Sequence, residues 1–275
     1  MTVQSKYLLS LREKNPLIHN ITNTIVINFV ANGLLALGAS PIMGQAIEEM
    51  EEFSFFCNGL ALNIGSINAL TLPSMLAASK AANRAGYPVV LDPVGVGISR
   101  YRREAVARIL DEVKFAAIRG NASEMSYLAT GNWGGKGVDV GENQADLAAV
   151  AREIALKYQT VAVISGEIDY VSDGQKLAKI SNGSALLPRI TGSGCLLTAV
   201  VDAFLATANL CSEQDKDYFL AAVEAVSFYG ICGEVAQESV AENACGHFYM
   251  SFLDALAQVC NEGFNKRAKI DYLNA

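Results

Sequence analysis

The sequence predicts an α/β fold built around a mainly parallel sheet. Short apolar or β-branched runs alternate with longer helical patterns along most of its 275 residues, and these runs lack the apolar–polar alternation of half-exposed strands. Strands of this kind are typical of a parallel sheet that helices cover on both faces. Since no internal repeat or low-complexity linker separates the elements, we expect residues 1–275 to form a single domain.

The first clear element is a helix predicted over residues 24–38. Its apolar residues cover nearly the whole circumference, whereas Asn28 and Asn32 share one face. A helix of this composition is either buried in a large core or packed against another subunit, and the sequence leaves both possibilities open. We expect the two asparagines to be hydrogen-bonded, buried amides rather than ligand contacts.

Four buried strands and the helices between them follow. Thr71, Leu72 and Pro73 open a helix that Gly86 closes, and the pair Asn121 and Glu124 resembles a capping box at the start of another helix. The strands are predicted at residues 58–64, 87–91, 114–118 and 160–164.

The pattern changes after residue 165. Glycines and Asp-Gly or Asn-Gly pairs bound three short segments, at 168–172, 175–180 and 184–188, which we predict to be antiparallel strands at the sheet edge. The remaining chain is helical in pattern, with long apolar-rich helices predicted at 193–208, 214–240 and 247–262.

Composition excludes several classes of protein. The formal charge of −7, the pI near 5.0 and the lack of any Lys or Arg run argue against nucleic-acid binding. The six cysteines never approach a CxxC spacing and only two histidines occur, so we expect neither a zinc site nor a redox dithiol. Charged residues interrupt the first twenty positions, and no run of about 18 apolar residues occurs. We therefore expect a reduced, cytoplasmic protein with no membrane segment.

Two segments carry signals for a ligand site beyond the carboxyl ends of the strands, where open α/β sheets bind ligands. Asp92 begins the segment DPVGVG at 92–97 and could hold a metal ion or orient phosphate-bound Mg²⁺, or it could cap a Pro-Gly turn. Arg119 offers a donor fork for phosphate, and Glu124 could hold Mg²⁺ through water. The alternative for residues 119–124 is an exposed arginine followed by an ordinary capping box.

The third segment, TGSGC at 191–195, is the most informative. Gly192 and Gly194 expose successive backbone N–H groups at the positive end of a helix, which predicts an anion hole for a phosphoryl group in transfer. A tight turn without a ligand is the less favoured alternative, because a plain helix start would use Ser, Thr or Asp as its cap. Leu197 stands where a dinucleotide fingerprint needs its third glycine, which disfavours a Rossmann dehydrogenase.

Taken together, these segments closely resemble the hydroxyethylthiazole kinases, the thiamine-salvage branch of the ribokinase-like superfamily. The resemblance covers about residues 5–260 and rests on HNITNTIVINFVANGLLALGASPIM from His19, LALNIGS from Leu60, VVLDPVGVG from Val89, RGNASE from Arg119 and TGSGC from Thr191. It implies a three-layer αβα fold and transfer of the γ-phosphate of ATP to the hydroxyl of 4-methyl-5-(2-hydroxyethyl)thiazole. It further implies dependence on Mg²⁺ and a homotrimer with active sites between subunits, which would give the helix at 24–38 a partner.

Carried over residue by residue, the resemblance implies a substrate site. Met43 and Gly192 match contacts to the substrate, and we expect Asn23 in the same site. His19 could line the thiazole pocket or have a structural role.

The same carry-over implies a nucleotide and metal site. Arg119 and Ser165 match ATP contacts, with Asn121 beside them, and Asp92 and Glu124 match the Mg²⁺ and phosphate environment.

Cys195 falls where most of the superfamily carries an aspartate base, with Ser193 and Gly194 completing the anion hole. Because a helix N-terminus can lower the pKa of a thiol from about 8.5, a Cys195 thiolate could accept the proton of the attacking alcohol. Two other interpretations stay open: a hydroxymethylpyrimidine kinase of the same superfamily, and a non-catalytic sensor of thiazole compounds.

Overall fold

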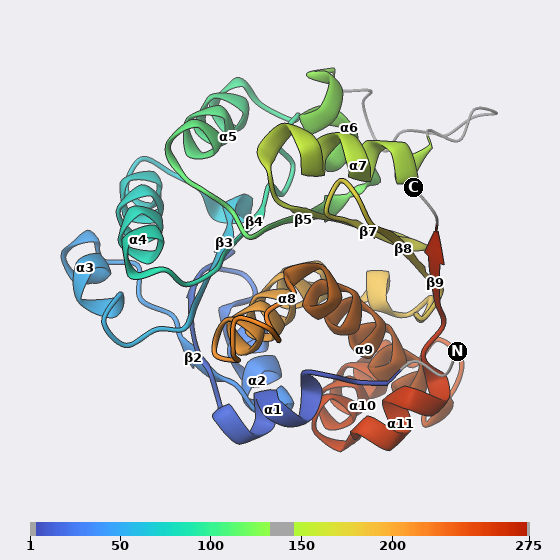
Figure 1. Cartoon of the computed structure of the whole chain (residues 1–275). Helices are drawn as coiled ribbons and strands as arrows, with labels where there is room; N and C mark the ends of the chain where they lie inside the picture. Colours follow the sequence, from blue (N-terminus) through green and yellow to red (C-terminus); the bar gives the residue numbers. More distant parts are fainter. Residues whose placement is uncertain (1–3, 133–145, 274–275) are drawn as a thin grey trace.

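The computed structural model describes residues 4–132 and 146–273, and it has three layers, with a central sheet between two layers of helices (Figure 1). The described strands follow the order β2-β1-β3-β4-β5-β6-β7-β8-β9. Pairing is parallel from β2 through β6 and antiparallel from β6 through β9. The predicted α/β fold class, with a mainly parallel sheet and antiparallel edge strands, is confirmed.

The strands are short and mostly buried. Their bounds are β1 Leu17–Ile21, β2 Ser40–Ile42, β3 Gly59–Asn63, β4 Val89–Asp92, β5 Ala117–Asn121, β6 Val161–Ser165, β7 Asp169–Ser172, β8 Leu177–Ile180 and β9 Ile270–Leu273.

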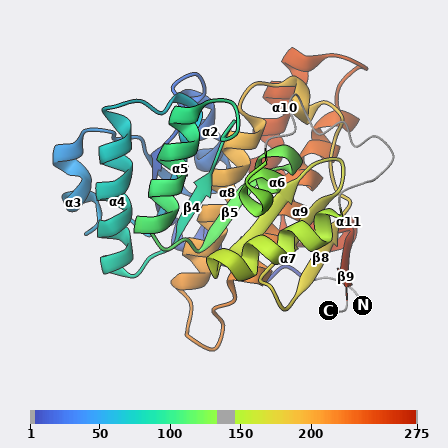
Figure 2. The same ribbon diagram turned by 90° about the horizontal axis from the view of Figure 1, so that it is seen from above.

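One face of the sheet carries α3 Met50–Phe53, α4 Thr71–Ala85, α5 Arg100–Glu112, α6 Ala122–Thr130 and α7 Leu147–Tyr158. Seen from above, α4 and α5 run side by side across it (Figure 2). The other face carries α1 Leu8–Lys14, α2 Ile27–Leu37, α8 Ser193–Asn209, α9 Tyr218–Glu238, α10 Cys245–Gln258 and α11 Asn261–Arg267. Short 3₁₀ turns lie at Ile47–Glu49, Ile64–Ser66 and Leu187–Arg189.

Successive strand residues point to opposite faces and so divide the core in two. On β3, Leu60 and Leu62 belong to the core under α4 to α7, whereas Ala61 faces the core around α8. α8 is buried along nearly all of its length, and its Phe204 lies 5.8 Å from Phe228 of α9, measured between ring centroids. This burial explains why α8 is apolar on every side.

Several predicted strand positions need correction. The strand predicted at 114–118 is β5, which lies three residues further along the chain, because it continues into the polar sequence of residues 119–121. The segment at 184–188 is not a strand: it ends in the 3₁₀ turn Leu187–Arg189, which contains Pro188, and the third antiparallel strand is β9. β1 and β2 were not predicted at all.

The helix predicted at 24–38 is α2, and its two asparagines are hydrogen-bonded as expected but not buried. Asn28 and Asn32 are exposed, and the Asn32 amide donates to the backbone carbonyl of Asn28 at 2.8 Å. Leu35 is 58% exposed and Ile25, just before the helix, is 78% exposed, whereas Val30 is fully buried. α2 therefore packs one face into the core and leaves Asn28, Asn32 and Leu35 exposed on the other.

The helix predicted at 214–240 is α9, which within the described residues is long and apolar enough to cross a membrane, with a mean hydropathy of 1.5. However, 83% of that apolar stretch is buried inside the fold. α9 is therefore a core helix. The predicted helix at 247–262 is divided into α10 and α11, which are separated at Val259 and Cys260.

Candidate functional site

The carboxyl ends of β1 to β6 lie at one edge of the sheet, because these strands are parallel, and the N-terminus of α8 lies beside them. The contact is direct, since Nη1 of Arg119 on β5 donates to the carbonyl oxygen of Gly194 in the first turn of α8, at 3.0 Å. The predicted phosphate-binding arginine and the predicted anion hole therefore meet in space.

Asp92, the last residue of β4, lies at the centre of this junction and is 1% exposed. Its Oδ2 accepts hydrogen bonds from Asn63 Nδ2 at 2.7 Å and Thr198 Oγ1 at 2.8 Å, and lies 3.5 Å from Nη1 of Arg119. Among the described residues, no partner forms a hydrogen bond with its buried Oδ1. Burial raises the pKa of this carboxyl above its ordinary value even though the Arg119 charge opposes that shift. Asp92 thus presents one fixed and one free oxygen.

Arg119 joins β5 to the strand beside it as well as to α8. Its Nη2 donates to Ser165 Oγ at the end of β6, where the sheet register pairs Asn121 with Ser165. Arg119 is 8% exposed, and within the part of the chain that the structure describes its Nε has no hydrogen-bond partner. A buried cation with a free donor favours an anionic ligand at this place.

The first turn of α8 has the conformation that an anion hole requires. Gly192 caps the helix with φ +93° and packs against Val26 and Phe29, where a Cβ atom would lie 2.7 Å from the Val26 side chain. No side chain caps the helix, so the first backbone N–H groups are left for other acceptors. A Cβ on Gly194 would lie 2.8 Å from Arg119 Nη1, so only glycine allows the close approach of the arginine.

Cys195 stands in that first turn and is partly buried. Burial raises the pKa of its thiol to about 11, and the negative charge of Asp92 adds to the shift. This shift is opposite in direction to the lowering that a helix N-terminus can produce.

Glu124 and Asn121 form the predicted capping box of α6. Glu124 Oε2 accepts from the backbone N–H of Asn121 at 2.8 Å, and Oε1 accepts from the N–H of Gly95 at 2.9 Å. The carboxylate therefore ties the loop after β4 to the start of α6. Each oxygen still has a lone pair for a further ligand.

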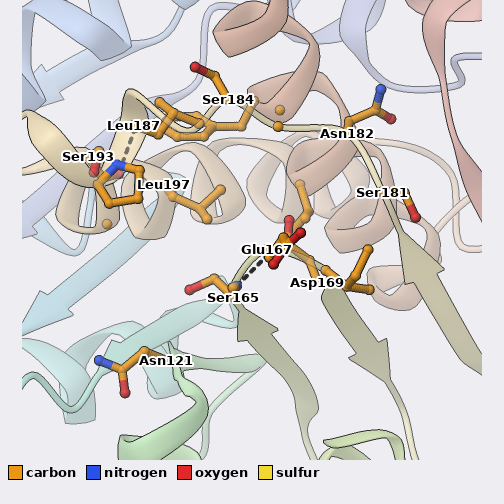
Figure 3. A pocket seen from close by; sticks show the side chains of 18 of the residues that line it. Asn121, Ser165, Glu167, Asp169, Ser181, Asn182, Ser184, Leu187, Ser193 and Leu197 are labelled. Carbon is orange, nitrogen blue, oxygen red and sulfur yellow. Dashed lines mark hydrogen bonds between the residues drawn. The ribbon is translucent and has the colours of Figure 1, made fainter. Parts of the chain in front are cut away.

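A cavity of about 810 Å³ opens next to this junction (Figure 3). Arg119, Asn121 and Ser165 line it on the sheet side, and Leu197 and Tyr229 line it on the helix side. It is large enough for a nucleotide-sized molecule.

Asp169 at the start of β7 also lines the cavity and is 8% exposed. It accepts a hydrogen bond from the N–H of Gly166 at 2.8 Å, and burial raises its pKa to about 7. The carboxylate thereby fixes the turn that follows Ser165.

Asn23 follows β1 and Met43 follows β2, the two strands at the end of the parallel part of the sheet that is opposite to β6. Met43 packs against the core around α8, and the next carbonyl, Gly44, accepts a 2.9 Å hydrogen bond from His19 Nε2 on β1. His19 is buried, which lowers its pKa, and its hydrogen bond joins β1 to the Met43 segment. Asn23 Oδ1 accepts from Ser66 Oγ at 2.7 Å and links the loops after β1 and β3.

Sequence reasoning missed two residues that hold the site together. Asn63 was placed within a strand without a role, and its position at the strand end was the available signal. Thr198 lies one turn after Cys195 inside an apolar helix and carries no local signal. Both donate to the same oxygen of Asp92.

The chain is similar to known proteins along nearly its whole length. The model of the hydroxyethylthiazole kinase family matches residues 8–262. A hydroxyethylthiazole kinase of Histophilus somni is 52% identical over 270 residues, covering 98% of this chain and 100% of the relative. The solved structure of the hydroxyethylthiazole kinase protein from Pyrococcus horikoshii OT3 has a TM-score of 0.86 at 34% identity, covering 98% of each chain. A ribokinase-like superfamily protein of Enterococcus faecalis, at 9% identity, TM-score 0.62 and coverage of 95% and 92%, shares the fold.

Proposed function

The chain belongs to the hydroxyethylthiazole kinase family, and we propose that the junction of Asp92, Arg119 and residues 192–195 is where it transfers a phosphoryl group. The activity is phosphorylation of hydroxyethylthiazole in thiamine salvage, with ATP as the phosphoryl donor. The observation that supports this position is the buried carboxylate of Asp92, which lies beside a cation and a helix N-terminus. In the residues that the structure covers, its Oδ1 has no hydrogen-bond partner.

The cavity beside Arg119 takes the nucleotide in this proposal. Arg119, Ser165 and Asn121 would lie along the phosphates, and the phosphoryl group in transfer would rest against the N–H groups of Gly194 and Cys195. Phosphoryl transfer depends mostly on positioning and on stabilisation of charge. Fixed backbone donors at a helix N-terminus supply both without reorganisation.

Asp92 and Glu124 fit Mg²⁺. The free Oδ1 of Asp92 is a hard oxygen donor, and Mg²⁺ is usually held by one or two carboxylates together with substrate phosphates and water. Among the residues that the structure describes, no three side chains of the His, Cys, Asp or Glu type gather as a metal cluster, so nucleotide phosphates would complete the coordination. When bound, the ion would neutralise charge on the phosphates.

The acceptor alcohol would lie between Met43 and Gly192, with Asn23 at the border of the same site. Val26 and Phe29, which pack against Gly192, give this side an apolar wall suited to a thiazole ring. Cys195 is next to the position of the attacking hydroxyl and is a neutral thiol before substrates bind, since burial raises its pKa to about 11. A protonated thiol has no basic site for a second proton, so we propose that the alcohol loses its proton late, to a phosphate oxygen or to water, after the bond to the leaving oxygen has weakened.

We further propose a homotrimer of single-domain chains in the cytoplasm. The exposed apolar side chains of Leu35 on α2 and of Ile25 just before it support contact with another subunit near the substrate loops. The continuous sheet from β2 to β9 supports one domain for residues 1–275. Six free cysteines support a reducing compartment.

The test is a coupled measurement of two products. With hydroxyethylthiazole, ATP and Mg²⁺, the purified protein should form ADP and thiazole phosphate in equal amounts, and chelation of Mg²⁺ should stop both. A protein that binds the thiazole without consuming ATP would be a sensor instead. Preferential phosphorylation of hydroxymethylpyrimidine would assign it to the sibling activity.

A further inference from the structure

Arg102, on α5, holds two loops of the site from the outer side of the sheet. Its Nη1 donates to the carbonyl oxygen of Ile64 at 2.8 Å and to that of Val94 at 2.7 Å, and its Nη2 donates to that of Gly65 at 2.7 Å. One side chain therefore ties the loop after β3 to the loop after β4.

These two loops carry the groups around the free oxygen of Asp92. The first loop begins with Asn63. Its Nδ2 donates to Asp92 Oδ2 at 2.7 Å, and its Oδ1 accepts from the N–H of Gly65 at 2.8 Å. The second begins at Asp92 itself and continues to Gly95, whose N–H binds Glu124. Both proposed metal-side carboxylates thus depend on the backbone that Arg102 fixes.

We propose that Arg102 is a positioning residue for phosphoryl transfer, which sets the spacing between the loop of Asn63 and the loop of Asp92. The inference rests on the proposed function and adds to it a residue that touches neither substrate. A planar guanidinium reaches three carbonyls in fixed directions, whereas a lysine ammonium is a point charge on a flexible stem. Arg102→Lys is therefore not a neutral change.

The contacts also separate the effect on turnover from the effect on binding. Arg102 is not among the residues that line the nucleotide cavity, and it has no hydrogen bond to the Met43 segment or to residues 192–195. Loosening its two loops should disturb Asp92 and Glu124 while leaving both binding surfaces in place. We expect kcat to fall and the KM values to stay nearly constant.

The experiment compares Arg102→Met, which keeps the alkyl stem, with Arg108→Met on the same helix. Arg108 is exposed and, in the residues that the structure covers, pairs only with Glu112, at 2.6 Å, so it is a matched control. Since a misplacement of about 1 Å can cost about 100-fold in rate, we expect kcat of Arg102→Met to fall by about 10- to 100-fold, with both KM values within about threefold of the parent. Arg108→Met should keep the parental kcat.

Amide hydrogen exchange supplies a readout that does not depend on turnover. In the ligand-free protein, residues 64–66 and 94–97 should exchange faster in Arg102→Met, whereas α8 should exchange as in the parent. If the parent does not phosphorylate hydroxyethylthiazole, the proposed function fails, and this measurement still tests the loop contact.

A parental kcat in folded Arg102→Met, or unchanged exchange in both loops, would overturn the proposal. An equal loss in Arg108→Met would do the same. If Arg102→Met does not fold, Arg102→Lys decides, because it keeps the charge and one donor group. An intermediate kcat would support the positioning role, and a parental kcat would refute it.

Discussion

Replacing Cys195 by alanine is expected to leave most of the turnover intact, although the resemblance to the ribokinase-like superfamily places this residue where an aspartate base is expected. The thiol is partly buried at the first turn of α8, close to the carboxylate of Asp92. Both burial and that negative charge favour the neutral thiol. The ligand-free enzyme therefore holds almost no thiolate at neutral pH.

The size of the effect follows from that pKa. With a pKa of about 11, the thiolate makes up about one part in 10⁴ of Cys195 at pH 7. A general base typically raises the rate by about 10²- to 10⁴-fold. Because so little of Cys195 is thiolate, this gain is offset by the small fraction of enzyme that carries the base. We expect kcat of Cys195→Ala to lie within about 10-fold of the parent. Cys195→Asp should be more active than the alanine variant, because a carboxylate near Arg119 offers a more populated proton acceptor.

The assay is kcat at saturating MgATP and hydroxyethylthiazole between pH 7 and pH 9. A preformed thiolate base would make the parental rate rise about tenfold per pH unit, a slope that Cys195→Ala would lose. We expect no such slope. Cys211→Ala, at another partly buried free cysteine, serves as the control for loss of a thiol. A loss above about 1000-fold in folded Cys195→Ala would refute the reasoning.

Two further predictions concern stability and assembly. Asp202 on α8 is fully buried and neither of its carboxylate oxygens has a partner, so burial raises its pKa well above the ordinary value. The folded chain then keeps a proton that the unfolded chain releases above about pH 4. The free energy of unfolding therefore falls by up to about 1.4 kcal/mol for each further pH unit, until the pH reaches the pKa of Asp202 in the folded chain. In urea unfolding, Asp202→Asn should therefore be more stable than the parent, by a margin that grows from pH 5 to pH 6. Asp111→Asn, at an exposed aspartate, is the control. A margin that stays constant with pH would contradict the prediction. Sedimentation tests the proposed trimer. Leu35→Glu should dissociate it and keep each chain folded, because Leu35 is 58% exposed, whereas Val30→Glu should unfold the chain, because Val30 is fully buried. A parent that sediments as an active monomer would remove the interface role.

The sequence predicted best those elements whose residues serve only the core. α4 was placed by its Thr-Leu-Pro start and the Gly86 end, and the structure has it at Thr71–Ala85. Errors gather where buried strands carry polar residues. β1 was missed because His19 and Asn20 interrupt its apolar run, and both side chains are nevertheless 1% exposed. The hydrogen bond from His19 to the carbonyl of Gly44 requires a polar side chain at a buried strand position, where the pattern that predicts a strand would have an apolar one.

The candidate site shows the same division between what local patterns specify and what tertiary contact decides. Asp92, Arg119 and Gly192 could be predicted because strand ends and a glycine turn before a helix are local features. The partners that fix them are distant in the chain: Asn63 lies 29 residues from Asp92, and Thr198 lies 106 residues from it. A helical period identifies which face of α5 or α8 is buried, but it does not specify which carbonyl Arg102 reaches or which oxygen Thr198 bonds. Residues that would meet the ligand were therefore open to prediction, whereas those that position them emerge only when the strands pair and the helices pack.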